Sequence, residues 1–200
     1  IGEENLLING SVTPNRDLVD EIAGLACGEV LIKDNLLIAG CFDQPVLENA
    51  ELIIPDTFYR KQVKSNFRRV SKPWHIFQFN KEELASDFNL VTAGRKSAPL
   101  SQTNRLINPE HIFAEEGAQL EYATINASPG PVYIGKNAII MEGALIRGSF
   151  ALCEGAVIKM GAKIYGPTTI GPFSRAGGEI TNSVFFAFSN FISILHSSIK

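Results

Sequence analysis

An aliphatic side chain recurs at every sixth residue through much of the second half of this 200-residue chain. The series comprises Ile134, Ile140, Ile146, Leu152, Ile158, Ile164 and Ile170. A strand has a side-chain period of two and a helix a period of 3.6, so neither requires this spacing. Hexapeptide repeats are a signature of parallel β-helices, in which successive coils stack their apolar residues into a continuous core.

The fourth residue after each aliphatic gives a second test, because it also points into the crowded interior of such a coil and should be small. The positions are Ala138, Ala144, Phe150, Ala156, Ala162, Thr168 and Ser174, and only Phe150 departs from the rule. The pattern therefore predicts an all-β, single-stranded, left-handed parallel β-helix with triangular coils of about 18 residues. An ordinary β-sandwich with accidental spacing is the alternative.

The predicted corners of the coils carry residues that tolerate left-handed backbone conformations. Asn137, Gly143, Gly155 and Gly161 fall at these positions. Glycine adopts positive φ at no steric cost, and asparagine does so more readily than β-branched residues. The corners thus support the same fold as the aliphatic register.

The first half of the chain mixes helical and strand patterns. Thr13-Pro14 offers a helix cap followed by proline, and Gly28 offers an end, which predicts a helix over about 14–27. Two β-prone runs flank Asp34-Asn35, which predicts a hairpin over 29–40.

Two further elements are predicted before the repeats begin. Asn80 with Glu83 resembles a capping box and predicts a short helix over 81–88, and the alternation in 74–79 is typical of a strand. The polar stretch 94–110 then marks a domain boundary. We expect part of an α/β domain in 1–100 and the β-helix in 111–200.

Charge and hydropathy argue against two classes of partner. The net charge is −3 without a long basic run, whereas a nucleic-acid binder needs a clustered positive surface. The locally basic segment 58–69 is interpreted as a solvated helix face, with a phosphate or nucleic-acid site as the alternative. No signal peptide and no bilayer-spanning apolar run is present, so a membrane partner is not expected.

The cysteines indicate a reducing compartment. Cys27, Cys41 and Cys153 are odd in number and include no CxxC pair. This usage fits free thiols in the cytoplasm and gives no zinc pattern.

Several segments resemble a bacterial branch of the bifunctional family related to N-acetylglucosamine-1-phosphate uridyltransferase/glucosamine-1-phosphate acetyltransferase. The resemblance lies in 6–22, 73–80, 87–97, 130–135, 140–152, 159–172 and 177–190. It covers nearly the whole chain and is most specific from IYGPTTIGP to GGEITNSV.

The resemblance implies two activities. In that family an α/β domain joins a sugar 1-phosphate to a nucleoside triphosphate with Mg²⁺, and a left-handed β-helix transfers an acetyl group from the cosubstrate acetyl-CoA. The first half of this chain resembles only the later part of the nucleotidyltransferase domain, without the glycine-rich nucleotide-binding segment. We expect the chain to be a piece of something longer that does not itself transfer nucleotides.

The resemblance also implies partners and a location. Solenoids of this kind usually pack side by side as trimers with ligands between subunits, so a homotrimer is expected. The implied small-molecule partner is a sugar phosphate or a nucleotide sugar, and the implied location is the cytoplasm.

Acetyl transfer requires cations for a sugar phosphate and polar groups that orient the substrate. Arg147 and Lys159 lie off the interior register and are the predicted phosphate-binding residues, and Tyr165 is predicted to orient a hydroxyl. Solvated surface charges and simple surface stacking are the alternatives. Glu179 and Asn182 lie in the most family-like segment, where a buried asparagine ladder is the alternative.

The family's histidine base usually follows Ser-Asn in a loop. Here Ser189-Asn190 continues directly into Phe191, so that loop is not found. His196 is the remaining candidate base, and His75 and His111 are expected to be structural.

Three functions therefore remain open at the level of sequence. The first is an enzyme of nucleotide-sugar metabolism with an acyltransferase site at a trimer interface. The second is a degenerate, non-catalytic member that binds a nucleotide sugar, and the third is a trimerisation scaffold.

Overall fold

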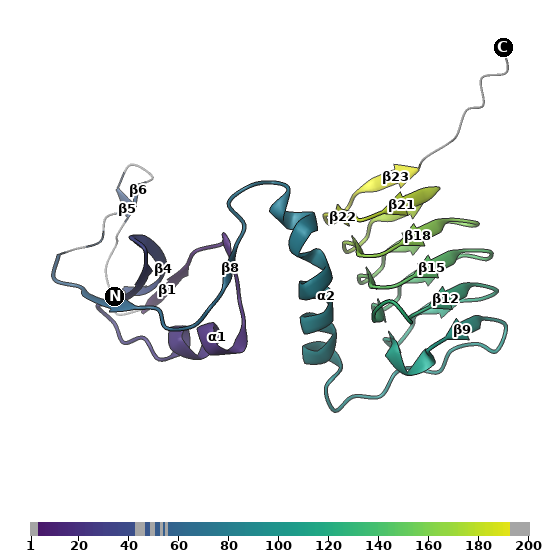
Figure 1. Ribbon diagram of the computed structural model, residues 1–200, viewed down its shortest axis with the longest axis horizontal. Helices are drawn as coiled ribbons and strands as arrows, with labels where there is room; N and C mark the ends of the chain where they lie inside the picture. Colours follow the sequence, from purple (N-terminus) through teal and green to yellow (C-terminus); the bar gives the residue numbers. More distant parts are fainter. Residues whose placement is uncertain (1–3, 43–46, 49–50, 53, 55, 193–200) are drawn as a thin grey trace, which may run out of the picture. The chain divides into compact units, whose positions relative to one another are not determined.

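The sixfold register folds into a parallel β-solenoid of about five turns in residues 105–191 (Figure 1). The computed structural model describes residues 4–42, 47–48, 51–52, 54 and 56–192. It divides into two compact units, Ile1–His75 and Ile76–Lys200, and the solenoid belongs to the second. The all-β repeat region predicted from the sequence is thus confirmed, whereas the hand of its coil stays a prediction.

Three parallel sheets form the sides of the solenoid, and each is named here by its middle strand. The β15 sheet contains β9 (Arg105–Ile107), β12 (Thr124–Asn126), β15 (Leu145–Arg147), β18 (Lys163–Tyr165) and β21 (Glu179–Thr181). The β16 sheet contains β10 (Ile112–Ala114), β13 (Val132–Ile134), β16 (Phe150–Leu152), β19 (Thr168–Ile170) and β22 (Val184–Phe185). The β17 sheet contains β11 (Gln119–Leu120), β14 (Ile139–Ile140), β17 (Val157–Ile158), β20 (Arg175–Gly177) and β23 (Asn190–Ile192).

The interior of the solenoid is the core that the register predicts. All seven aliphatics from Ile134 to Ile170 are at most 3% exposed, and the residues four positions after them are at most 1% exposed. Phe150, the exception to the small-residue rule, fits because its neighbours in register are the smaller Val132 and Thr168. Each buried aliphatic contributes about 1.5–3 kcal/mol, so stacking replaces a two-layer core.

One corner position shows why glycine is needed there. Gly155 has φ 61°, and a Cβ built on it would lie 2.6 Å from the Phe173 ring of the next coil. Phe173 and Phe188 occupy the following corners with φ 56° and 61°, and their rings stack with centroids 5.4 Å apart.

The last turn is shorter than the register predicts. Ile146 pairs with Ile164 at the full repeat, but Ile164 then pairs with Ile180 rather than with Asn182. Two residues are missing from the corner before β21, so Ile180 is buried and Asn182 is an exposed turn residue with φ 45°. The alternative of a buried asparagine ladder is therefore wrong.

The first unit contains a four-stranded sheet in the order β1-β4-β3-β7, formed by β1 (Asn5–Ile8), β3 (Glu29–Lys33), β4 (Leu36–Phe42) and β7 (Tyr59–Gln62). The predicted hairpin is confirmed: β3 and β4 are antiparallel, and Asp34 and Asn35 have φ 48° and 63°. Two small antiparallel pairs complete the strands: β2 (Val12–Thr13) with β8 (Arg68–Arg69), and β5 (Leu47–Glu48) with β6 (Glu51–Leu52).

Two sequence predictions in this unit need correction. The helix α1 spans Arg16–Ala23, with Asn15 as its cap and Gly24 at its end, because Thr13 is engaged in β2. The basic segment 58–69 is not a helix face: it supplies β7, which pairs with β3, and β8. In both cases strand pairing within the fold overrides the local helix signal.

The short helix predicted over 81–88 is confirmed, but it is part of a longer helix that also takes the place of the strand predicted over 74–79. Helix α2 spans His75–Thr92 and runs along the solenoid (Figure 1). Asn80, the predicted cap, lies inside the helix, and its Oδ1 accepts a 2.8 Å hydrogen bond from the Thr169 hydroxyl on β19. Helix α2 packs on the outward face of the β16 sheet. This packing stabilises the helical conformation of 75–79, which the local sequence pattern does not predict.

The boundary between the two compact units differs from the domain boundary that the sequence predicts. The compact units divide after His75, because α2 packs with the solenoid. The domain boundary predicted in 94–110 concerns the change in sequence pattern, and it stays a prediction.

None of the helices among the described residues has the length and apolar character needed to cross a membrane. A 3-10 turn, Pro109–His111, leads into β10.

The stacked aliphatic residues inside the solenoid give a direct stability test. Ile164→Ala should lower the free energy of unfolding by about 2–5 kcal/mol, because it leaves a cavity between two stacked coils. The neighbouring Lys163→Ala removes an exposed side chain from the same strand and should cost no more than about 0.5 kcal/mol. Denaturant unfolding measures both, and equal effects would contradict the assignment of Ile164 to the core.

Candidate functional site

Two of the predicted site residues are neighbours on the outer face of the β15 sheet. Arg147 on β15 pairs in register with Tyr165 on β18, and both side chains are exposed. Adjacent strands lie about 4.8 Å apart, so the guanidinium and the phenol can reach one ligand.

Lys159 lies on a different side of the solenoid. It directly follows β17 and is half-buried, whereas Arg175 on the adjacent β20 is exposed. Arg147 and Lys159 therefore belong to different sheets of the same solenoid, and the structure does not bring them together within one copy of the chain.

Glu179 and Asn182 are both exposed. Glu179 on β21 pairs in register with Lys163 on β18, so opposite charges are neighbours on the β15 sheet. Asn182 lies in the bend between β21 and β22.

The histidines supply no general base beside these residues in the described part of the solenoid. His111 is exposed in the 3-10 turn before β10, and the predicted base His196 lies outside the described residues. His75 lies against the backbone: its Nδ1 is 3.0 Å from the carbonyl oxygen of Arg69 and 3.3 Å from the Ser71 amide nitrogen, and the tautomer decides which of the two it bonds.

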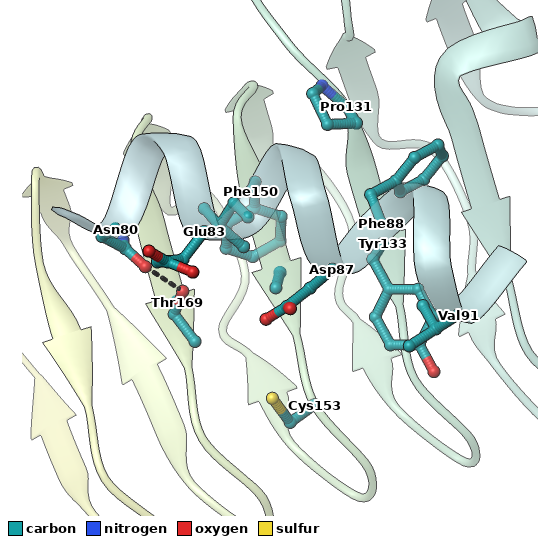
Figure 2. Close-up of a pocket in the computed structure, with 12 residues that line it drawn as sticks. Asn80, Glu83, Asp87, Phe88, Val91, Pro131, Tyr133, Phe150, Cys153 and Thr169 are labelled. Atoms are coloured by element: carbon teal, nitrogen blue, oxygen red, sulfur yellow. Dashed lines mark hydrogen bonds between the residues drawn. The ribbon is translucent and has the colours of Figure 1, made fainter. Parts of the chain in front are cut away.

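A groove of about 300 Å³ lies between α2 and the β16 sheet (Figure 2). From the helix it is lined by Asn80, Glu83, Leu84, Asp87, Phe88 and Val91, and from the solenoid by Pro131, Tyr133, Phe150, Ala151, Cys153 and Thr169. The sequence does not predict this groove, because nothing in the helix expected over 81–88 shows that it packs against the solenoid. The spacing of Glu83 and Asp87, four residues apart, would have placed both carboxylates on one helix face.

The groove is acidic. Glu83 and Asp87 point toward the sheet (Figure 2), and no lysine or arginine is among the lining residues. Burial, followed by the nearby Glu83 carboxylate, raises the pKa of Asp87 above its usual value. Burial likewise raises the pKa of the Cys153 thiol, which disfavours its thiolate form at neutral pH.

An ion pair fixes the chain just beyond α2. Arg95 donates to both carboxylate oxygens of Glu115, at 2.8 and 2.5 Å, and the Tyr133 hydroxyl donates to Glu115 Oε1 at 2.8 Å. The hydrogen bonds from Arg95 are the main cause of a lowered pKa of Glu115. Burial, together with the hydrogen bond to Glu115, raises the pKa of Tyr133 to about 12. Tyr133 is thus a hydrogen-bond donor at neutral pH and not a base.

Comparison with known proteins identifies a similarity in the first half of the chain. Residues 1–96 match a family model described as a sugar nucleotidyl transferase. No curated protein sequence matches the chain significantly. The match ends just after α2 and before the solenoid begins.

The groove generates a prediction about pH. Because the pKa of Asp87 is raised on folding, its ionisation opposes folding at pH 7, and this cost is absent below the pKa of the unfolded side chain. Asp87→Asn should therefore stabilise the protein at pH 7 by up to about 0.5 kcal/mol, since Asp87 lies at the open edge of the groove. The gain should vanish near about pH 3.

Thermal unfolding at the two pH values measures this difference. Glu82→Gln removes an exposed carboxylate from the same helix, outside the groove, and is the matched control. A loss of stability in Asp87→Asn at pH 7, or the same gain at both pH values, would contradict the raised pKa of Asp87.

Proposed function

We propose that the protein acts in nucleotide-sugar metabolism and that its solenoid transfers an acetyl group from acetyl-CoA to an amino-sugar phosphate. The observation that carries the proposal is the joining of a region similar to sugar nucleotidyl transferases to a β-solenoid with outward-facing cations. Phosphate binding by Arg147 and Lys159 would hold the acceptor, with Tyr165 oriented toward one of its hydroxyls.

The location of the cations supports a site shared between copies of the chain. Arg147 and Lys159 lie on different sheets, so one phosphate can meet both only where the β15 sheet of one copy faces the β17 sheet of another. Contact between two unlike faces generates a closed ring if the rotation closes, and three triangular prisms satisfy that condition. The third face is covered by α2 and its groove, which leaves these two faces for assembly.

The outer face of the β15 sheet has the apolar surface that such an interface needs. Ile107, Leu145 and Tyr165 are 43%, 47% and 42% exposed. Exposed aliphatic and aromatic side chains gathered on one sheet are typical of a protein interface. We therefore propose a homotrimer as the form of the protein that binds substrate.

The reaction requires few groups from the protein. The acceptor amine attacks the thioester carbonyl, the new carbon–nitrogen bond forms, and the carbon–sulfur bond breaks to release the thiol of coenzyme A, which takes up the proton lost by the amine. A base at the amine accelerates the first step. His196 remains the candidate for that role.

A second candidate is a non-catalytic protein that binds a nucleotide sugar or serves as a trimerisation scaffold. The observation in its favour is β23: Asn190 runs straight into a strand that pairs with β20, at the point where the similar family has its histidine loop. This alternative retains the two exposed faces and the cations but not the acetyl transfer.

Release of coenzyme A thiol distinguishes the two functions. The complete gene product, with acetyl-CoA and a panel of amino-sugar phosphates, should release thiol in step with amide formation. Arg147→Ala and Lys159→Ala should each lower kcat/KM roughly 10- to 100-fold, because each removes a charged hydrogen bond to phosphate.

Lys81→Ala, which removes an exposed lysine from α2, is the control and should leave turnover unchanged. Nucleotide-sugar binding without thiol release from any amino sugar would favour the non-catalytic alternative. Equal turnover in all variants would remove Arg147 and Lys159 from the site.

The proposed trimer has its own test. Sedimentation velocity should give the mass of three chains, and Leu145→Glu should give monomers because it places a carboxylate in the apolar part of the β15 face. Leu90→Glu makes the same change at a 76% exposed position on α2 and should stay trimeric. A monomeric parent protein, or a trimeric Leu145→Glu variant, would contradict this arrangement.

A further inference from the structure

Three chain segments bring metal-ligating side chains together in the first unit, where the sequence gives no zinc pattern. Glu4 directly precedes β1, Cys27 precedes β3, and Cys41 lies on β4. The two thiol sulfurs are 3.0 Å apart, and the ligand atoms of all three residues lie within 4.8 Å of one another. The two cysteines are 14 positions apart in the chain, so they form no local metal-binding motif.

The sheet itself sets this arrangement. Strand β4 lies between β1 and β3 and is antiparallel to both, so the start of each neighbour lies at the end of β4. Leu6 pairs with Cys41, which places Glu4 at the same edge. The Gly28 amide donates to the Cys41 carbonyl oxygen at 3.0 Å, and the backbone turns at Gly28, whose φ is 82°. These two features hold Cys27 next to Cys41.

The cluster of Glu4, Cys27 and Cys41 carries ligand atoms but no cationic partner among the described residues. Cys41 is 6% exposed and Cys27 is half-buried, whereas Glu4 lies at the surface. Among the described residues, no lysine or arginine forms an ion pair with Glu4, and the nearby Glu29 is already engaged by Lys61 Nζ at 2.5 Å. A cation is the group that would complement two thiolates and a carboxylate held at this distance.

We propose that Glu4, Cys27 and Cys41 form a zinc site. Two thiolates and one carboxylate are a ligand set that Zn²⁺ accepts, with zinc–sulfur bonds of about 2.3 Å and a water in the fourth position of the tetrahedron. The sulfurs of such a site lie about 3.8 Å apart, so the two side chains need to separate by about 0.8 Å, a small rotation. The ion ties the edge of the sheet together and releases the thiol protons as it binds.

Titration of the reduced, complete protein with cobalt(II), followed by zinc(II), tests the site. We expect one equivalent of cobalt, a near-ultraviolet absorption from thiolate-to-cobalt charge transfer, and loss of that absorption when zinc displaces cobalt. Cys27→Ser and Cys41→Ser should each weaken zinc binding by at least about tenfold, and Glu4→Gln should weaken it while retaining the thiolate absorption.

Cys153→Ser is the matched control, because Cys153 lies in the solenoid and should leave the titration unchanged. A measurement that needs no variant accompanies it: zinc should slow the alkylation of Cys27 and Cys41, mapped by mass spectrometry, but not that of Cys153. Cobalt binding without thiolate absorption, or alkylation rates that zinc does not change, would overturn the proposal. Oxidation of the pair to a disulfide, with no zinc uptake after reduction, would also overturn it.

Discussion

The stacking of aliphatic side chains between successive coils is the interaction on which the second half of the molecule depends. Most inward aliphatic residues meet an aliphatic residue of the next coil, as Ile146 meets Ile164 and Ile134 meets Leu152, and alanines fill the space between them. A single coil cannot bury its own apolar face, so every turn is stable only because its neighbours are present. A change in one inward residue therefore acts on three coils.

Because the inward residues alone form the core of the solenoid, the outward residues are not needed for its stability. Side chains alternate between the interior and the surface along each short strand, so Arg147 and Tyr165 can vary without disturbing the aliphatics beside them. The three sides of the prism are then used differently. One is covered by α2 and encloses an acidic groove, whereas the other two carry the cations and the exposed apolar residues.

The sequence predicts the parts of the fold that follow from short periods and fails where distant segments meet. The sixfold register and the turn at Asp34-Asn35 are local signals, and both are confirmed. The first part of helix α2 is missed because the residues over 74–79 alternate like a strand, and their conformation is decided by the packing of α2 on the β16 sheet. Ile180 is missed because two residues absent from one corner shift the register.

The same reasoning separates the candidate sites. Arg147, Lys159 and Tyr165 can be selected from the sequence because a repeat shows which residues are free of the core, yet the repeat says nothing about which sheet faces which in an assembly. Cys27 and Cys41 cannot be selected at all, since a β-sheet edge, and not spacing along the chain, brings their sulfurs to 3.0 Å. Antiparallel pairing on both sides of β4 makes that meeting obligatory: any sequence that keeps the register of Leu6 with Cys41 and the turn at Gly28 places these side chains together. The ligand set is therefore a property of the fold of the first unit.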